Sequence, residues 1–196
     1  MLHNLRIKEV KRETEDAVSI YLEIPENLKE EFKYIPGQYV TFETTINGEE
    51  VRRAYSLCTS PYTDAVPGIA VKQVEGGKMS TYLNQTVKAG DMIDVLAPNG
   101  KFIAEMNADA QKHYVLFGGG SGITPLRSIL KSALTQEQSS RVTLIYANRN
   151  PGAREAAMKK CIILFLFVVT GGRAHADVTV NYASSNIVDG VYGGIA

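Results

Sequence analysis

The sequence predicts two architectures in succession: an antiparallel β-barrel or sandwich over residues 1–105, and the start of an α/β parallel sheet over residues 106–150. Three observations predict this division. Short runs of alternating apolar and polar residues, separated by turn residues, fill the first part. After Pro98-Asn99-Gly100, continuous apolar runs replace the alternation. A glycine-rich loop then joins the first of these runs to a helical pattern.

Six runs in the first part have the length and alternation of half-buried strands. They cover residues 5–11, 18–24, 38–44, 51–61, 68–74 and 92–97. Pro25 ends the second run, and Asn47-Gly48 is a hairpin signal between the third and the fourth. Six short strands at this spacing favour a small antiparallel barrel or a sandwich.

Composition and charge argue against several functional classes. The 196 residues carry 21 Lys and Arg against 21 Asp and Glu, so no net field favours nucleic acid or an anionic membrane as a partner. The two cysteines, Cys58 and Cys161, are far apart and lack metal-ligand spacing. We therefore expect no metal site and a reducing, cytoplasmic location. The N-terminus also has no apolar core of signal-peptide length.

The fourth predicted strand places a cation beside an aromatic ring. Arg53 and Tyr55 share a face of this strand and lie about 7 Å apart, because a strand rises roughly 3.3 Å per residue. A guanidinium can donate two hydrogen bonds to a phosphate while a phenol ring lies against a flat heterocycle. This pair favours a nucleotide-like cofactor. Taken alone, such a pair is more often a half-exposed strand with a surface arginine and a packed tyrosine.

A short helix is predicted after the Gly76-Gly77 turn, with Met79, Tyr82 and Leu83 facing inward and Ser80 or Thr81 near its start. A helix N-terminus presents unpaired amides and partial positive charge, which favour phosphate. Beside Arg53 it would complete a diphosphate site. A Gly-Gly pair before a helix is, by itself, usually only a turn.

The second part begins with an apolar run over residues 113–117, which predicts a strand buried on both faces. The glycine-rich loop Gly118 to Pro125 follows, with Thr124 predicted as the helix N-cap and Pro125 as its first residue. Helical spacing then continues through Leu126, Ile129, Leu130 and Leu134. Strand, glycine loop and helix in this order bring backbone amides close to a pyrophosphate. Ile123 occupies the position of the third glycine in the usual dinucleotide-binding pattern.

A further strand over residues 141–147 ends at Asn148 and Arg149. The strand–helix–strand unit predicts a parallel pair with a right-handed crossover. Ligands of such sheets lie at the carboxyl ends of the strands. Asn148 and Arg149 are therefore candidates to meet a ribose or a 2′-phosphate, and the alternative is a polar loop that closes the strand.

Three motifs, Arg53-Ala54-Tyr55-Ser56, Gly76 to Ser80 and Gly118 to Pro125, occur in an order and spacing that resemble the ferredoxin-NADP reductase family. The likeness is greatest to reductase components of the phenylacetyl-CoA epoxidase type and covers residues 1 to about 150. It implies an antiparallel flavin-binding β-barrel over residues 1–105. A truncated α/β parallel-sheet nucleotide-binding domain, begun over residues 106–150, would follow.

The resemblance also implies roles for individual residues. Arg53 would hold the flavin diphosphate, and Tyr55 would stack on the isoalloxazine ring. Ser56 would hydrogen-bond near the reactive nitrogen, and Thr124 would lie close to nicotinamide and flavin, which makes Tyr55, Ser56 and Thr124 the catalytic candidates. The other cofactor-binding candidates are Val71, Lys72, Val74, Gly77, Lys78, Met79, Ser80, Gly118, Gly119, Gly120, Gly122, Asn148 and Arg149.

The implied activity is hydride transfer from NADPH or NADH to a flavin, FAD in preference to FMN, and then to a one-electron acceptor. That acceptor would be a ferredoxin-like iron-sulfur protein or an oxygenase component. No four-cysteine cluster is present, so we expect no iron-sulfur cluster in this chain. As a candidate to bind a 2′-phosphate, Arg149 slightly favours NADPH over NADH as the donor. The alternative is a truncated flavin-binding module without NAD(P)H turnover.

Residues 151–196 depart from the family pattern. Met158 with two lysines, an apolar run over 161–169 and Ala174-His175-Ala176 have the layout of a secretory signal peptide, although an internal one cannot act as an N-terminal signal. The run is also shorter than the ~20 residues that span a bilayer. We interpret the tail as foreign sequence, from a frameshift, a fused neighbouring reading frame or a truncated gene. The alternative is a third buried strand over 162–169.

Overall fold

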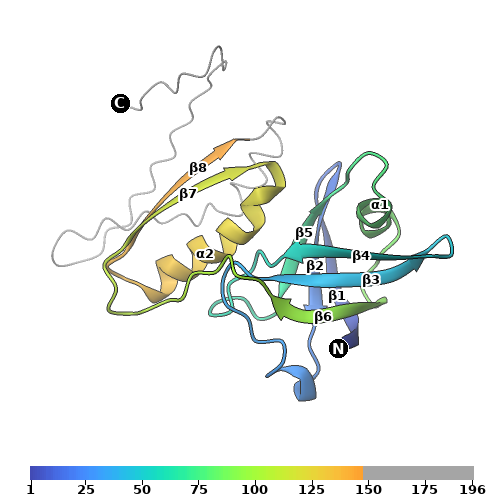
Figure 1. The fold of residues 1–196 in the computed structure, drawn as a ribbon, viewed down its shortest axis with the longest axis horizontal. Coiled ribbons are helices and arrows are strands. Elements are labelled where there is room, and N and C mark those ends of the chain that lie inside the picture. Colours follow the sequence, from blue (N-terminus) through green and yellow to red (C-terminus); the bar gives the residue numbers. More distant parts are fainter. Residues whose placement is uncertain (148–196) are drawn as a thin grey trace, which may run out of the picture.

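The computed structural model describes residues 1–147, which form a curled antiparallel sheet and, beside it, a parallel strand pair with one helix (Figure 1). The antiparallel sheet has the order β4-β3-β6-β1-β2-β5. Its strands are β1 (Leu2–Thr14), β2 (Ala17–Glu23), β3 (Tyr39–Ile46), β4 (Glu49–Ser56), β5 (Gly68–Lys72) and β6 (Met92–Asn99). An antiparallel bridge between Leu57 and Ile69 joins the chain after β4 to β5 and brings the two edges of the sheet together.

All six predicted strands occur, and the barrel expectation is confirmed. Asn47 and Gly48 form the two-residue turn between β3 and β4, with φ of +51° and +79°. Both angles are positive, as a tight hairpin that matches the strand twist requires. Alternation along the strands sends Leu5, Ile20 and Phe42 into the core, where each is 0% exposed.

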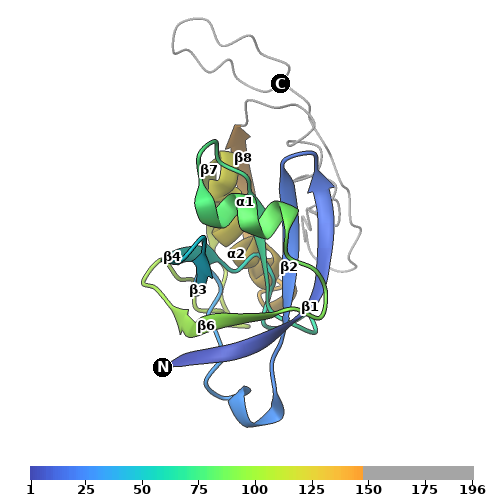
Figure 2. The same cartoon turned by 90° about the vertical axis from the view of Figure 1, so that its right-hand side faces the viewer.

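The helix α1 (Lys78–Gln85) closes one end of the barrel (Figure 2). Met79 and Leu83 are buried in the barrel core, and Tyr82 is partly buried against it, so the predicted inward face of the helix is confirmed. A short 3₁₀ turn, η1 (Glu26–Leu28), lies in the connection from β2 to β3.

The second unit consists of β7 (His113–Gly119), the 3₁₀ turn η2 (Gly120–Gly122), α2 (Ile123–Gln136) and β8 (Arg141–Ala147). The strands β7 and β8 are parallel, as predicted. Leu126 and Ile129 of α2 pack against Leu116 and Val142 of the sheet.

Two sequence predictions for this unit are wrong. The strand over 113–117 is not buried on both faces within the described residues, because α2 covers only one; Val115 and Phe117 on the other are 46% and 70% exposed. Thr124 does not cap α2, which begins at Ile123 after Gly122. Its hydroxyl instead donates to the Ser121 carbonyl oxygen at 3.0 Å, because η2 already winds the chain before the helix.

The loop after β4 and the helix α2 form a polar joint between the two units. The Ser128 hydroxyl donates to the Thr59 carbonyl oxygen at 2.6 Å, and the buried hydroxyls of Ser60 and Ser132 lie 2.8 Å apart. Arg127 donates to the Cys58 carbonyl oxygen at 2.5 Å. The next turn of the helix adds the ion pair between Lys131 and Asp64. Directional bonds, rather than apolar contact alone, therefore set the position of α2 on the barrel.

Within residues 1–147, no helix is long and apolar enough to cross a bilayer. The interpretations of Asn148, Arg149 and the tail over 151–196 lie outside the described residues.

Candidate functional site

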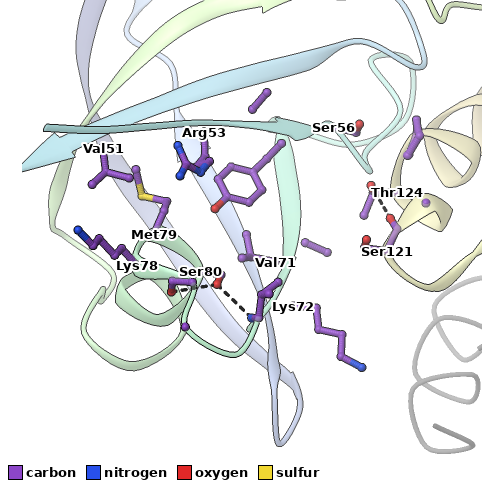
Figure 3. A pocket seen from close by; sticks show the side chains of 18 of the residues that line it. Val51, Arg53, Ser56, Val71, Lys72, Lys78, Met79, Ser80, Ser121 and Thr124 are labelled. Atoms are coloured by element: carbon purple, nitrogen blue, oxygen red, sulfur yellow. Dashed lines mark hydrogen bonds between the residues drawn. The ribbon is translucent and has the colours of Figure 1, made fainter. Parts of the chain in front are cut away.

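A cleft of about 760 Å³ runs along β4, past β5 and the start of α1, to the start of α2 (Figure 3). Most of the predicted site residues within the described range line it. They are Arg53, Tyr55, Ser56, Val71, Lys72, Val74, Gly77, Lys78, Met79, Ser80, Gly122 and Thr124. Residues from both units therefore face one space, and Figure 3 shows Ser121 and Thr124 of the second unit opposite Ser56 of β4.

Gly118, Gly119 and Gly120 do not line this cleft. They lie where β7 ends and η2 begins. A Cβ on Gly118 would lie 2.9 Å from Leu126 Cδ1, so a glycine lets α2 pack closely on the strand. A Cβ on Gly119 or Gly120 would meet nothing within 4 Å, so there is free space beside this loop, and the Gly120 carbonyl oxygen accepts a hydrogen bond from the Tyr146 hydroxyl at 2.8 Å.

Eight further residues line the cleft that were not among the predicted site residues, although four of them lie within the three sequence motifs. They are Glu49, Glu50, Val51, Ala54, Ala70, Gly76, Ser121 and Pro125. Two could be found from the pattern, because Glu49 and Val51 continue the alternating face of Arg53 and Tyr55 toward the hairpin. Ser121 lies between two predicted glycines, and its position depends on η2, which no sequence signal indicated.

Arg53 brings an available positive charge to the middle of the cleft. Its Nη1 donates to the carbonyl oxygen of Arg52 at 2.7 Å, and it forms no ion pair with a carboxylate of the described residues. The neighbouring Arg52 does not line the cleft and is paired with Glu43 of β3. Adjacent arginines thus have different environments because successive side chains of a strand point to opposite faces.

Tyr55 is fixed by the barrel core. Its ring meets the ring of Phe42 edge-on, with centroids 5.8 Å apart and planes at 63°. Burial raises the pKa of Tyr55 to about 12, and nearby Arg53 lowers it by less. The phenol therefore remains neutral at physiological pH and presents a positioned aromatic surface to the cleft.

The N-terminus of α1 supplies backbone donors beside Arg53. No side chain caps this helix, whose N-cap is Gly77. A Cβ on Gly77 would lie 2.5 Å from Ser80 Oγ, so the turn requires glycine there. Ser80 Oγ accepts from the Val74 amide at 3.1 Å and donates to the Gly77 carbonyl oxygen at 3.2 Å. The Ser80 hydroxyl thereby holds the turn, and the first amides of the helix are left as donors for an anion.

The arrangement suits a ligand with a flat aromatic part and an anionic part. A guanidinium and free helix amides provide for phosphate, and Tyr55 provides an aromatic surface next to them. The described residues thus fit a flavin nucleotide by the chemistry of their donor set. Fold and cleft together are typical of a nucleotide-binding protein in which a barrel and an α/β unit line one cleft.

Comparison with known proteins agrees with this class. Residues 4–103 match the family model of the oxidoreductase FAD-binding domain, and residues 116–160 match that of the oxidoreductase NAD-binding domain. The chain belongs to this family of FAD-binding oxidoreductases, the ferredoxin-NADP reductase family that its motifs resemble.

Two curated relatives and one solved structure illustrate the similarity. The chain is 40% identical over 147 residues to a component of the 1,2-phenylacetyl-CoA epoxidase of Escherichia coli, covering 75% of this chain and 41% of the relative. It is 41% identical over 147 residues to the ferredoxin reductase component of a Rhodococcus rhodochrous 3-ketosteroid-9-alpha-monooxygenase, covering 74% and 41%. The flavohaem-like FAD/NAD-binding domain of Vibrio cholerae nitric oxide dioxygenase superposes with a TM-score of 0.68 at 28% identity, covering 82% and 68%. The chain thus spans less than half the length of these curated relatives.

Proposed function

We propose that the chain binds FAD in this cleft and serves as an NAD(P)H-dependent reductase that passes electrons to a one-electron acceptor. The single observation that carries the proposal is that Arg53 and Tyr55 of the barrel and Thr124 of the α/β unit line the same space. Bound FAD would supply the conversion of a two-electron hydride donor into a one-electron source. The protein supplies binding, orientation and exclusion of water.

Each group in the cleft has a proposed task. Arg53 and the first amides of α1 bind the diphosphate, and Tyr55 packs against the flavin ring. Ser56 would donate a hydrogen bond to the ring, and the strand backbone at Val71 and Lys72 would lie along it. The amides of Gly119 and Gly120 would bind the phosphates of NAD(P)H, and Thr124 would lie close to the nicotinamide and the flavin.

The proposed acceptor is a redox protein, either ferredoxin-like or an oxygenase component. The names of the two curated relatives, one an epoxidase component and one a monooxygenase ferredoxin reductase component, support this class. A cytoplasmic location is also proposed. It is supported by Cys58, a free and buried thiol, since free thiols are usual in a reducing compartment.

A second candidate function is a flavin-binding module without NAD(P)H turnover. It is favoured by the bare face of the β7–β8 sheet within the described residues, where Val115 and Phe117 meet solvent. Under this alternative the barrel holds FAD, and the α/β unit does not bind NAD(P)H productively.

One experiment separates the two functions. The purified chain is reconstituted with FAD, and its flavin absorbance is followed under anaerobic conditions during addition of NADPH or NADH. Loss of the flavin absorbance on addition of NADPH or NADH supports the reductase function. A yellow protein that neither nucleotide bleaches supports the binding module, and a protein that takes up neither FAD nor FMN contradicts both.

A further inference from the structure

The cleft continues beyond Arg53 toward the tip of the β3–β4 hairpin. Glu49, Val51, Arg53 and Tyr55 alternate along β4, and all four line the cleft. At about 3.3 Å per residue, Glu49 lies roughly 13 Å from Arg53 along the strand. A ligand bound at Tyr55 and Arg53 can therefore extend further along β4, toward Glu49 and away from α2.

An ion pair spans this end of the cleft. Lys78, the first residue of α1, donates from Nζ to the carboxylate of Glu49 on β4. Figure 3 shows Lys78 beside Met79 and Val51, at the opposite end of the cleft from Thr124. The Lys78 and Glu49 side chains are 52% and 65% exposed, so water screens the pair and either partner can be exchanged readily.

Lys78 places a positive charge beside two glutamates at the hairpin end of the cleft. Glu49 and Glu50 both line the cleft there, and the hydrogen bond from Lys78 lowers the pKa of Glu49. Without the Lys78 ammonium, an anionic ligand group that reaches this end would face two carboxylates. A neutral group, or a ligand too short to reach it, would not be affected in this way.

This inference rests on the proposed flavin site. With the flavin ring at Tyr55 and the first phosphate at Arg53, a mononucleotide ends at Arg53. A dinucleotide continues with a second phosphate and an adenosine. That second phosphate carries the same sign of charge as the Glu49 carboxylate, so the two are competitors for one ammonium group.

We propose that the Glu49–Lys78 pair sets the selectivity of the cleft for a dinucleotide over a mononucleotide flavin. On binding of the dinucleotide, Lys78 leaves Glu49 and binds the second phosphate. Glu49 opposes this exchange, because it competes for the ammonium and repels the phosphate. Lys78 thus acts as a specificity residue for FAD, and Glu49 limits how tightly FAD is held.

The test compares the two flavins on the full-length apoprotein. FAD and FMN are titrated separately, and quenching of flavin fluorescence gives each affinity. Lys78→Gln lowers FAD affinity about tenfold, as loss of one hydrogen bond to a charged group does, and leaves FMN affinity unchanged. Glu49→Gln raises FAD affinity and not FMN affinity, and most of this gain disappears when Lys78→Gln is added. Lys78→Arg keeps FAD affinity near that of the unaltered chain.

Glu43→Gln is the matched control. It breaks a second carboxylate ion pair of the same hairpin, that with Arg52, and neither residue lines the cleft. Glu43→Gln is expected to change neither the affinity for FAD nor the affinity for FMN. An equal loss of FAD and FMN affinity in Lys78→Gln, or no loss of either, overturns the selectivity role.

Salt dependence gives a second readout that needs no variant. Added salt weakens FAD binding to the unaltered chain more than FMN binding, since an extra charged contact is screened. Equal salt effects on the two flavins overturn the inference. Failure of the unaltered chain to bind either flavin instead overturns the proposed function, so the two failures are distinguishable.

Discussion

The barrel and the α/β unit differ in how fully they bury their apolar side chains. In the barrel, Leu5, Ile20 and Phe42 are each 0% exposed within one continuous core. In the α/β unit, one face of the parallel pair packs on α2, and Phe117 on the other face is 70% exposed. The strand that carries Arg53 and Tyr55 therefore stands on a complete core, whereas the glycine loop stands on a sheet covered on one side among the described residues.

The largest effect should come from the barrel core. Phe42→Ala removes a fully buried ring that also supports Tyr55, and we expect a loss of about 3–5 kcal/mol in the free energy of unfolding. Phe117→Ser on the bare sheet face should change it by roughly 0.5 kcal/mol or less. Urea unfolding of the two variants measures both. Similar losses would show that the two units are not packed as differently as their exposures indicate.

The next effect concerns flavin retention. Arg53→Ala should weaken FAD binding by about 1.5–3 kcal/mol, since a charge-assisted contact to phosphate is lost. Arg52→Ala is the matched control, because Arg52 is the adjacent arginine of β4 and does not line the cleft. Flavin titration of both variants gives the comparison. Unchanged affinity in Arg53→Ala would mean that the diphosphate lies elsewhere.

A substitution in the glycine loop should separate flavin binding from reduction. Gly120→Leu places a side chain in the open space at the loop, and we expect reduction by NAD(P)H to slow by roughly ten- to a hundredfold while flavin content stays the same. Gly48→Leu is the control, because Gly48 also has a positive φ and open space but lies in the β3–β4 turn. Anaerobic stopped-flow absorbance measures the rate. Loss of flavin from Gly120→Leu would contradict the assignment of this loop to NAD(P)H and would indicate that it contacts the flavin.

The smallest effect is a pH dependence in the α/β unit. Burial by itself would raise the pKa of Glu137, but hydrogen bonds from Ser140, the Asn107 amide, Lys112 and Tyr114 outweigh it and lower the pKa below the ordinary 4.5. Glu137 therefore stabilises the fold above pH 4.5, and this contribution is lost as the pH falls further and the carboxylate becomes protonated. We expect a decrease of about 1 kcal/mol, or roughly 2–4 °C in the unfolding midpoint. Glu137→Gln should remove this part of the acid sensitivity, and an unchanged acid profile would contradict the assignment.

The sequence predicted the barrel better than the α/β unit for physical reasons. Alternation and the Asn47-Gly48 turn are local signals, and they determine strand pairing when one face is buried. The run over 113–117 is apolar at positions that point to both faces, and composition alone does not tell which face is covered. The prediction that Thr124 caps the helix was wrong because the turn η2 precedes the helix, and no local residue indicates that turn.

The same distinction applies to the cleft. Arg53 and Tyr55 were predicted together because two residues of one strand have a fixed separation. The pairing of Glu49 with Lys78 was not predicted, since it depends on where α1 packs against β4, 29 positions further along the chain. Separations within one strand follow from the residues themselves. That Arg53, Ser80 and Thr124 share one cleft was implied by the order of the three motifs, whereas no motif implied the contact of Glu49 with Lys78.

The polar joint between the loop after β4 and α2 affects the entropy of ligand binding. The loop carries Cys58, Thr59 and Ser60, and it continues directly from Tyr55 and Ser56 of the cleft wall. The two walls of the cleft are thus connected through a few residues and several directional bonds. A ligand that touches both walls meets surfaces already held in position, so little conformational freedom of the protein is lost when it binds.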